Sequence, residues 1–161
     1  MKTLRFKCRN GFCFGYRRQG LNLYRQKEVL ELGNRAKDWL RQAYRDLAHA
    51  KLSREAGNHE WACFAAQQSA EKAVKALHLY YGQEAWGHVI YKLLMELPFN
   101  QDVGEELIDK AKVLDAFYIP ARYPNGYPEG APFENIGALQ SKEALEYASE
   151  ILEFVSSKMA F

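Results

Sequence analysis

The segment HEWACFAAQQSAEKAVKALHLYY, from His59 to Tyr81, decides the fold of this chain. It contains no Gly or Pro and is rich in Ala, Glu, Lys, Leu and Gln, so local preference favours a helix about 35 Å long. A helix at a protein surface shows one apolar stripe, whereas apolar residues here occupy most of the circumference. They fall into two groups: Cys63, Ala66, Ala70, Val74, Leu77 and Tyr81, and Trp61, Phe64, Ala65, Ala73, Ala76 and Tyr80. We therefore predict the central helix of a bundle, covered on more than one side.

Helical patterns on both sides of this segment predict an all-α, up-and-down antiparallel bundle of four main helices and a short one. The preceding helix is expected to begin near Asn34 and to end at Gly57, and the tight Gly57–Asn58 link makes the two helices antiparallel neighbours. The last helix is expected to have Ser141 as its N-cap. The other predicted helices are a short one at 21–32 stopped by Gly33, a short one at 88–97 stopped by Pro98, and one at 104–119.

Residues 1–34 are predicted to form a basic N-terminal extension, and residues 35–161 the helical bundle domain. The extension carries eight Lys and Arg residues against two Glu residues, while the rest of the chain is mildly acidic. Alternating apolar and polar residues before Gly20 suit a short hairpin. Two interpretations stay open: a basic arm attracted to phosphate backbones, or a solvated, disordered extension with no part in the fold.

The composition is that of a single soluble globular domain. Of the 161 residues, 48% are hydrophobic and 26% are charged, which is sufficient for a core without disulfides. The three cysteines are an odd number, which favours a reducing compartment, and Cys8 and Cys13 lack the second pair that a zinc site needs. The chain has no apolar run of about 18 residues and no convincing signal peptide. We expect a cytoplasmic protein with no membrane association, metal or cofactor.

Residues 119–138, IPARYPNGYPEGAPFENIGA, differ in kind from the rest of the chain. They contain four of the five prolines and three glycines, which predicts a long loop. Loops of this length inside a compact domain often carry function. Arg122 and Tyr123 lie between two of the prolines, which restrict the backbone and so limit the directions of both side chains.

Several of these residues together resemble the HEPN domain family, in particular its nucleotidyltransferase-associated type. The segment QQSAEKAVKAL at 67–77 and the tetrapeptide ARYP at 121–124 carry most of the resemblance, which extends from about Arg35 to the C-terminus. The other matching positions are Trp39, Ala43, Asp46, Leu47, Gly82, His88, Leu114 and Tyr118. The resemblance implies an all-α bundle, often a homodimer, that is frequently paired with a small nucleotidyltransferase-fold protein in toxin–antitoxin-like systems. Some members are metal-independent endoribonucleases, and others are nucleotide- or RNA-binding modules without catalysis.

The ribonuclease branch uses an Arg followed by a His, after four to six intervening residues, late in the domain. Imidazole accepts a 2′-hydroxyl proton near neutral pH, and a guanidinium stabilises charge on phosphate. No His follows His88, so Arg122 has no such partner. Arg54 and His59 have the spacing but lie across the link between two helices, where the family motif is not found. We therefore predict no catalytic residues.

The predicted ligand site combines the central helix with the proline-rich loop. Lys72 and Lys75 are charged residues on a largely covered helix, so we expect them to edge a cleft, where they suit a phosphate. The alternative is that both side chains merely extend out of the bundle, with Lys75 paired to Glu71 one turn before it.

In the loop, Arg122 is expected to hold a phosphate while Tyr118 or Tyr123 stacks on a base. The alternative is a loop pinned to the bundle by an Arg–carboxylate pair and tyrosine packing. His88 either contacts the ligand or caps its short helix. The candidate ligand-binding residues are Glu71, Lys72, Lys75, His88, Tyr118, Arg122 and Tyr123.

Three hypotheses for function follow from the sequence. The first is a HEPN-type nucleotide- or RNA-associated binding module, non-catalytic and paired with a minimal nucleotidyltransferase. The second is a metal-independent endoribonuclease toxin, against which the missing Arg/His motif counts. The third is an oligomeric scaffold that binds no ligand.

Overall fold

The computed structural model describes the backbone of residues 17–160 and the side chains of residues 35–100 and 102–160. This part of the chain contains helices and no strands, which confirms the all-α fold, while the suggested N-terminal hairpin lies outside it. The helices are α1 Arg17–Glu55, α2 His59–Tyr80, α3 Ile90–Met95, α4 Glu105–Asp115, α5 Pro132–Asn135 and α6 Ala138–Lys158. Two 3-10 turns, η1 Asn100–Asp102 and η2 Pro124–Gly126, lie in the connections.

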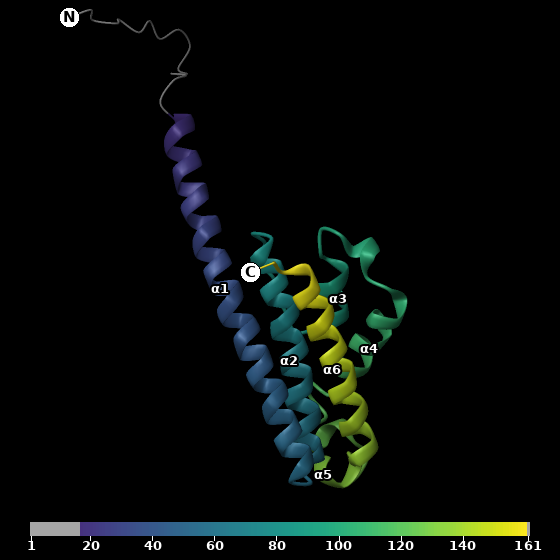
Figure 1. Ribbon diagram of the computed structural model, residues 1–161. Coiled ribbons are helices and arrows are strands. Elements are labelled where there is room, and N and C mark those ends of the chain that lie inside the picture. The colour runs from purple at the N-terminus through teal and green to yellow at the C-terminus, as the bar shows by residue number, and fades with distance from the viewer. Residues whose placement is uncertain (1–16, 161) are drawn as a thin grey trace, which may run out of the picture.

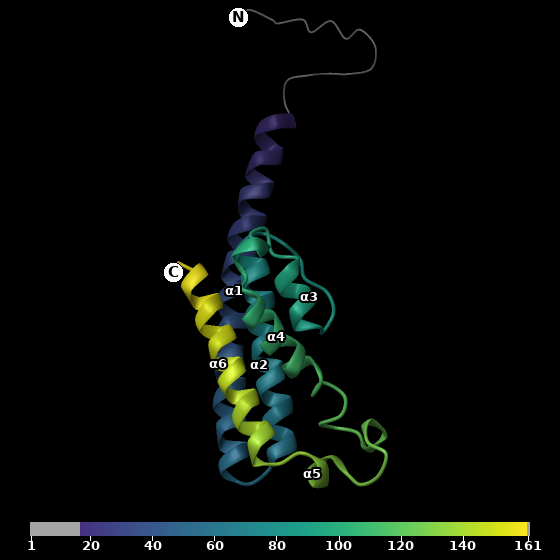
Figure 2. The ribbon, with the colours of Figure 1, turned by 90° about the vertical axis from the view of Figure 1, so that its right-hand side faces the viewer.

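The predicted central helix is α2. It lies between α1 and α6 (Figure 1), and α3 and α4 complete the packing around it. Figure 2 shows that the connection from α4 to α5 extends on the side of the bundle opposite to α6. None of the described helices is long and apolar enough to cross a membrane.

The burial of α2 accounts for its composition. Small residues such as Ala66, Ala70 and Ala73 are completely buried, as are the larger Val74 and Leu77. The buried part of the helix also contains four polar residues, which require partners inside the protein. These residues are Gln67, Ser69, Glu71 and His78.

The packing of α1 against α2 depends on small side chains. Ala36, Ala43 and Ala50 of α1 are fully buried, and their spacing of seven residues places them on one face of the helix. The Ser69 hydroxyl of α2 donates a hydrogen bond of 2.7 Å to the main-chain carbonyl of Ala43. A serine side chain is short, so this bond requires the two helix backbones to lie close together.

The N-terminal helices differ from the prediction, because α1 is one continuous helix through Gly33 and Asn34. The predicted stop at Gly33 and the N-cap at Asn34 are therefore wrong. A glycine inside a helix costs only about 1 kcal/mol relative to alanine, which good helix formers on both sides offset. The division into regions at residues 34 and 35 stays a prediction, and α1 crosses it.

The turn between α1 and α2 is as predicted, because Gly57 has a φ of 80° that favours glycine and ends the helix. The last helix starts earlier than predicted, because α6 begins at Ala138 with Gly137 as its N-cap. The Gly137 N–H donates to Gln140 Oε1 at 3.0 Å, which supplies a cap one turn before the predicted one. Ser141 is instead buried inside the first turn of α6.

The close contact between α1 and α2 generates a stability prediction. We expect Ala43→Leu to lower the free energy of unfolding by about 1–3 kcal/mol, because the added atoms must separate the helices and break the bond from Ser69. Ala48→Leu, at an exposed position of the same helix, should change it by less than about 0.5 kcal/mol. Urea unfolding of the two variants measures the difference, and equal losses would contradict close packing at Ala43.

Candidate functional site

A buried carboxylate lies at the centre of the candidate site. Glu71, on α2, is only 4% exposed. Its Oε1 accepts a 2.8 Å hydrogen bond from Lys75 Nζ and a 3.1 Å bond from His88 Nδ1. Its Oε2 accepts bonds from the amides of Gln67 and Gln68, at 3.3 and 3.4 Å. These partners compensate for the burial of the charge, so Glu71 is an organising residue rather than a surface carboxylate.

The two glutamines connect α2 with the loop that leads to α3. Gln67 is fully buried, and its amide nitrogen also donates to the main-chain carbonyl of His88 at 3.2 Å. Gln68 donates to Gln67 Oε1 at 2.7 Å. Sequence reasoning did not include either residue in the site, although a glutamine on a covered helix was a signal that could have found them. Together with Glu71 they fix His88 through both its backbone and its ring.

Lys72 forms contacts in a different direction from Lys75. Its ammonium group lies 2.6 Å from Asp46 Oδ2 of α1, and Gln42 donates to the other oxygen of that carboxylate at 2.6 Å. Lys72 Nζ also donates to Gln68 Oε1 at 3.3 Å. These contacts direct Lys72 toward α1 rather than toward the proline-rich loop, so its predicted role toward phosphate has less support than that of Arg122.

The loop after α4 brings Arg122 to the same region as His88. The His88 ring stacks on Tyr118, with ring centroids 4.8 Å apart and planes 15° from parallel. The central carbon of the Arg122 guanidinium lies 4.7 Å from the Tyr118 ring centroid, 4.6 Å from that of Phe64 and 5.1 Å from that of Tyr123. The geometry therefore links Glu71, through His88 and Tyr118, to Arg122. Phe64 belongs to α2, and the sequence did not indicate its contact with Arg122 because its position there is that of an ordinary core residue.

Arg122 has no acidic partner among the described residues. Its Nε donates to the Tyr118 main-chain carbonyl at 2.9 Å, and its central carbon lies over three aromatic rings. Of the alternative, a loop pinned by an Arg–carboxylate pair and tyrosine packing, the ion pair is therefore wrong, whereas packing of Arg122 on Tyr118 and Tyr123 is present. Ring contacts and one backbone bond hold the side chain, which leaves its terminal N–H groups available along the edge of the guanidinium plane.

Close packing within the loop fixes the residues that follow Arg122. The Tyr123 N–H donates to the Ile119 carbonyl at 3.2 Å, which closes a helical turn at the start of the loop. The 3-10 turn η2 then folds back so that Gly126 lies against Pro120. A Cβ added to Gly126 would lie 2.9 Å from Pro120 Cβ, closer than such atoms approach, so glycine is required here.

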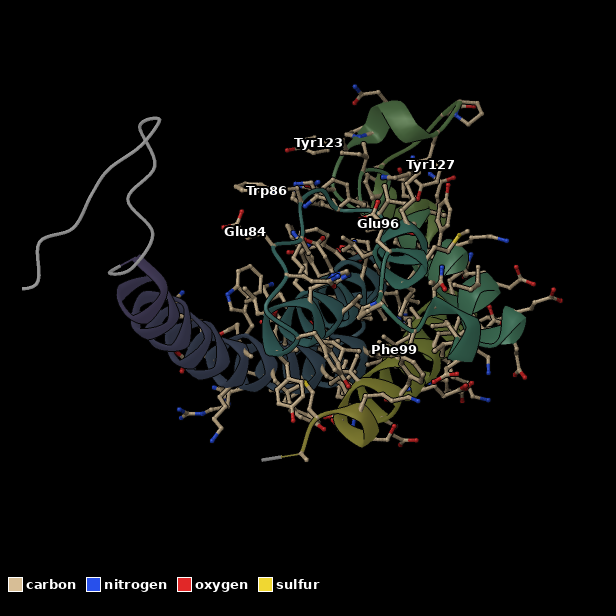
Figure 3. All side chains as sticks on the ribbon, turned by 90° about the horizontal axis from the view of Figure 1, so that it is seen from above. Glu84, Trp86, Glu96, Phe99, Tyr123 and Tyr127 are labelled. Atoms are coloured by element: carbon tan, nitrogen blue, oxygen red, sulfur yellow. The ribbon has the colours of Figure 1, made fainter. Side chains whose placement is uncertain are left out.

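Two exposed aromatic residues belong to the loops that carry His88 and Arg122. Trp86, in the loop before α3, is 83% exposed, and Tyr123 is 49% exposed. Figure 3, a view from above, shows both on the side of the molecule opposite to α6. The exposure of Trp86 shows that it is not a core residue. Exposed rings near an arginine can stack on a planar ligand.

Asp115 connects the end of α4 to the start of α3, next to His88. Its two carboxylate oxygens accept bonds from the Ile90 and Tyr91 N–H groups at 2.7 and 3.2 Å. Burial raises the pKa of Asp115, the nearby charge of Glu71 adds to the rise, and the two N–H bonds oppose it. Asp115, not His88, therefore caps the short helix, which leaves the His88 ring free for the contacts with Glu71 and Tyr118.

The buried cysteine and two other histidines do not belong to this site. Cys63 is buried, and burial, with a smaller effect of Glu60, raises the pKa of its thiol to about 12, so it is not a nucleophile at neutral pH. The His78 ring lies inside the bundle, with its nitrogens 3.0 Å from Gln83 Oε1 and 2.9 Å from the Leu93 carbonyl. His59 Nδ1 lies 2.9 Å from the hydroxyl of Ser141 on α6.

Comparisons with known proteins agree on one family. The HEPN domain family model matches residues 36–158. Three solved structures are similar to this chain. TT1696 from Thermus thermophilus shares 52% identity over 78% of this chain and 99% of its own, with a TM-score of 0.76. ST0689, an archaeal HEPN homologue, shares 40% identity over 76% of this chain and 95% of its own, with a TM-score of 0.65. A HEPN domain protein (tm0613) from Thermotoga maritima shares 35% identity over 74% of this chain and 95% of its own, with a TM-score of 0.60.

A search of curated proteins found no match. The family match nevertheless covers most of the chain, and it includes α2 and the proline-rich loop. The helical fold, the match to the family and the three related structures together give one conclusion. The chain belongs to the HEPN domain family.

Proposed function

We propose that this HEPN domain is a non-catalytic binding module for a nucleotide or RNA, and that the ligand's phosphate binds at Arg122. One observation carries the proposal: the guanidinium is stacked among three aromatic rings and has no acidic partner among the described residues. An arginine that is held in place but not neutralised is suited to an external anion.

The surroundings of Arg122 favour a phosphate attached to a base. A guanidinium binds phosphate oxygens through two parallel N–H groups in its own plane, and the terminal N–H groups of Arg122 have no hydrogen-bond partner among the described residues. Tyr123 and Trp86 offer exposed rings on which a base can stack. Lys75 neutralises Glu71, so the buried carboxylate does not repel an incoming anion. His88 and Tyr118 complete the surface, and Lys72 has a secondary role because Asp46 already binds it.

The proposal includes two protein partners. These are a second copy of the chain, in a homodimer, and a nucleotidyltransferase-fold protein, in a toxin–antitoxin-like system; the family resemblance supports both.

The second candidate is a metal-independent endoribonuclease, and the position of His88 favours it. The ionised Glu71 carboxylate can only accept, so it fixes the proton on His88 Nδ1 and leaves Nε2 as the basic nitrogen of a neutral ring. The His88 side chain is 55% exposed. Its Nε2 could accept the proton of a 2′-hydroxyl, whose oxygen attacks the adjacent phosphorus and displaces the 5′-oxygen of the next nucleotide; that oxygen takes a proton from water, and a 2′,3′-cyclic phosphate remains. Arg122 could stabilise the charge that develops on the phosphate. The order of this pair along the chain departs from the family motif, because here the His comes before the Arg.

Calorimetric titration with ATP and GTP tests the first candidate. We expect Arg122→Ala to weaken binding by about tenfold or more, the equivalent of about 1.4 kcal/mol, because a charge-assisted bidentate contact is lost. Arg122→Lys should also weaken it, since lysine has no planar fork. Lys112→Ala, which removes an exposed lysine paired with Asp109 on α4, is the matched control and should bind normally. Unchanged binding by Arg122→Ala would refute the site, and indifference to every nucleotide would favour the scaffold.

Incubation of labelled single-stranded RNA with the protein and a chelator separates the two candidates. We expect the RNA to be bound but left intact, because the late Arg/His motif is missing. Cleavage that is lost in His88→Ala and in Arg122→Ala would establish the ribonuclease instead. Cleavage that is lost in His59→Ala or Arg54→Ala would assign catalysis to the other Arg/His pair and overturn the proposed ranking.

The proposed homodimer has its own measurement. Light scattering on the purified full chain should give twice the 18.6 kDa mass of one chain, and the mass should fall toward that of one chain on dilution if the interface is small. A constant mass of one chain at high protein concentration would exclude the dimer without affecting the proposed ligand site.

A further inference from the structure

A second group of cations without acidic partners lies on another side of the bundle, in a groove between α1 and α6. The groove contains a cavity of about 490 Å³. Lys51 and Arg54 line it from the last turns of α1, and Lys142, Leu145 and Glu146 line it from α6. Figure 2 and Figure 3 show the loop that carries Tyr123 on the side opposite to α6, so this groove is separate from the Arg122 site.

Arg54 borders this groove; its Nε–H group is buried and lacks a partner, so a ligand in the groove would bind the terminal N–H groups of Arg54 rather than its Nε. Its Nε is shielded from solvent and has no hydrogen-bond partner among the described residues. A buried N–H group without an acceptor costs free energy, so such groups are rare in folded proteins and call for an explanation. No ion pair of the described structure includes Arg54 or the neighbouring Lys51.

The carboxylates of the groove do not neutralise these two cations. Glu150, which also lines the cavity, pairs with Lys110 of α4. Glu146 lies 3.7 Å from Lys142, one turn before it on α6. Each acidic side chain therefore has another cationic partner, and the positive charges of Lys51 and Arg54 remain uncompensated.

We propose that the groove between α1 and α6 binds a phosphate group, held by Arg54 and Lys51 with Lys142 at its edge. An arginine and a lysine together supply several charged N–H donors, which suits the oxygens of a phosphate. The cavity is larger than a phosphate ion, so it also accommodates a small phosphate ester, whose carbon chain would contact Leu145. None of the lining residues is aromatic, so the groove offers no surface for a base and recognises the phosphate alone.

Glu146 gives the proposal a distinctive test. It forms the looser ion pair of the two carboxylates of the groove, at 3.7 Å from Lys142, so it competes with the ligand for Lys142, and its negative charge raises the energy of an anion bound in the groove. Glu146→Gln keeps the size of the side chain and removes its charge. We therefore expect this variant to bind phosphate several-fold more tightly than the unaltered protein, which a merely structural role of Arg54 does not predict.

The experiment is an NMR titration of the isotope-labelled full chain with inorganic phosphate and with glycerol 3-phosphate, at constant ionic strength. Saturable shifts are expected for the amides around Lys51–Arg54 and Leu145–Glu150. Arg54→Gln should raise the Kd about tenfold or more, and Lys51→Gln, an exposed position that does not endanger folding, should raise it several-fold. Arg122→Ala should leave it unchanged, which separates this groove from the proposed nucleotide site.

Tighter binding of glycerol 3-phosphate than of inorganic phosphate would identify an ester as the ligand, and equal binding would identify the phosphate ion; both support the site. Three results would overturn it. These are the absence of saturable shifts in the groove, an unchanged Kd in both Arg54→Gln and Lys51→Gln, and weaker binding in Glu146→Gln.

Discussion

The close approach of α1 and α2 is the constraint on which the rest of the structure depends. Alanines on both helices, and the hydrogen bond from Ser69 to the Ala43 carbonyl, hold the two backbones together. With α6 on its other side, α2 is enclosed along most of its length. Polar residues on an enclosed helix must find partners within the protein. The network around Glu71 is the result, so the arrangement of the candidate site follows from the packing of small side chains some distance away.

The sequence was sufficient for the fold because apolar spacing and composition are local signals. The excess of apolar positions between His59 and Tyr81 correctly predicted a central helix. The helix boundaries were less certain, because Gly33 and Ser141 are usual end signals whose weight depends on their neighbours. For the site, the sequence indicated the residue types at Glu71, Lys75 and Arg122. It did not indicate their contacts, since pairs such as His88 with Glu71, or Arg122 with Phe64, are far apart in the chain.

The two proposed anion sites share a physical principle but differ in how the arginine is held. Arg122 is held by three aromatic rings and one backbone hydrogen bond, so its position is restricted while its terminal N–H groups have no partner among the described residues. Arg54 is held at the end of a helix, where burial of its Nε rather than stacking restricts it. In both, the nearby carboxylates are engaged by other cations: Glu71 by Lys75, and Glu150 by Lys110. A chain with nearly balanced charge thus retains local positive surfaces.

The length of α1 has a geometric consequence for whatever is attached before it. The helix continues without a break from Arg17 to Glu55, and its first half projects beyond the bundle (Figures 1 and 2). Each residue of a helix adds a rotation of about 100° and an advance of about 1.5 Å. The insertion of one residue into the projecting half would therefore swing a tethered group around the axis by more than a quarter turn. The insertion of four residues would bring the group to within about 40° of its original direction, about 6 Å further out.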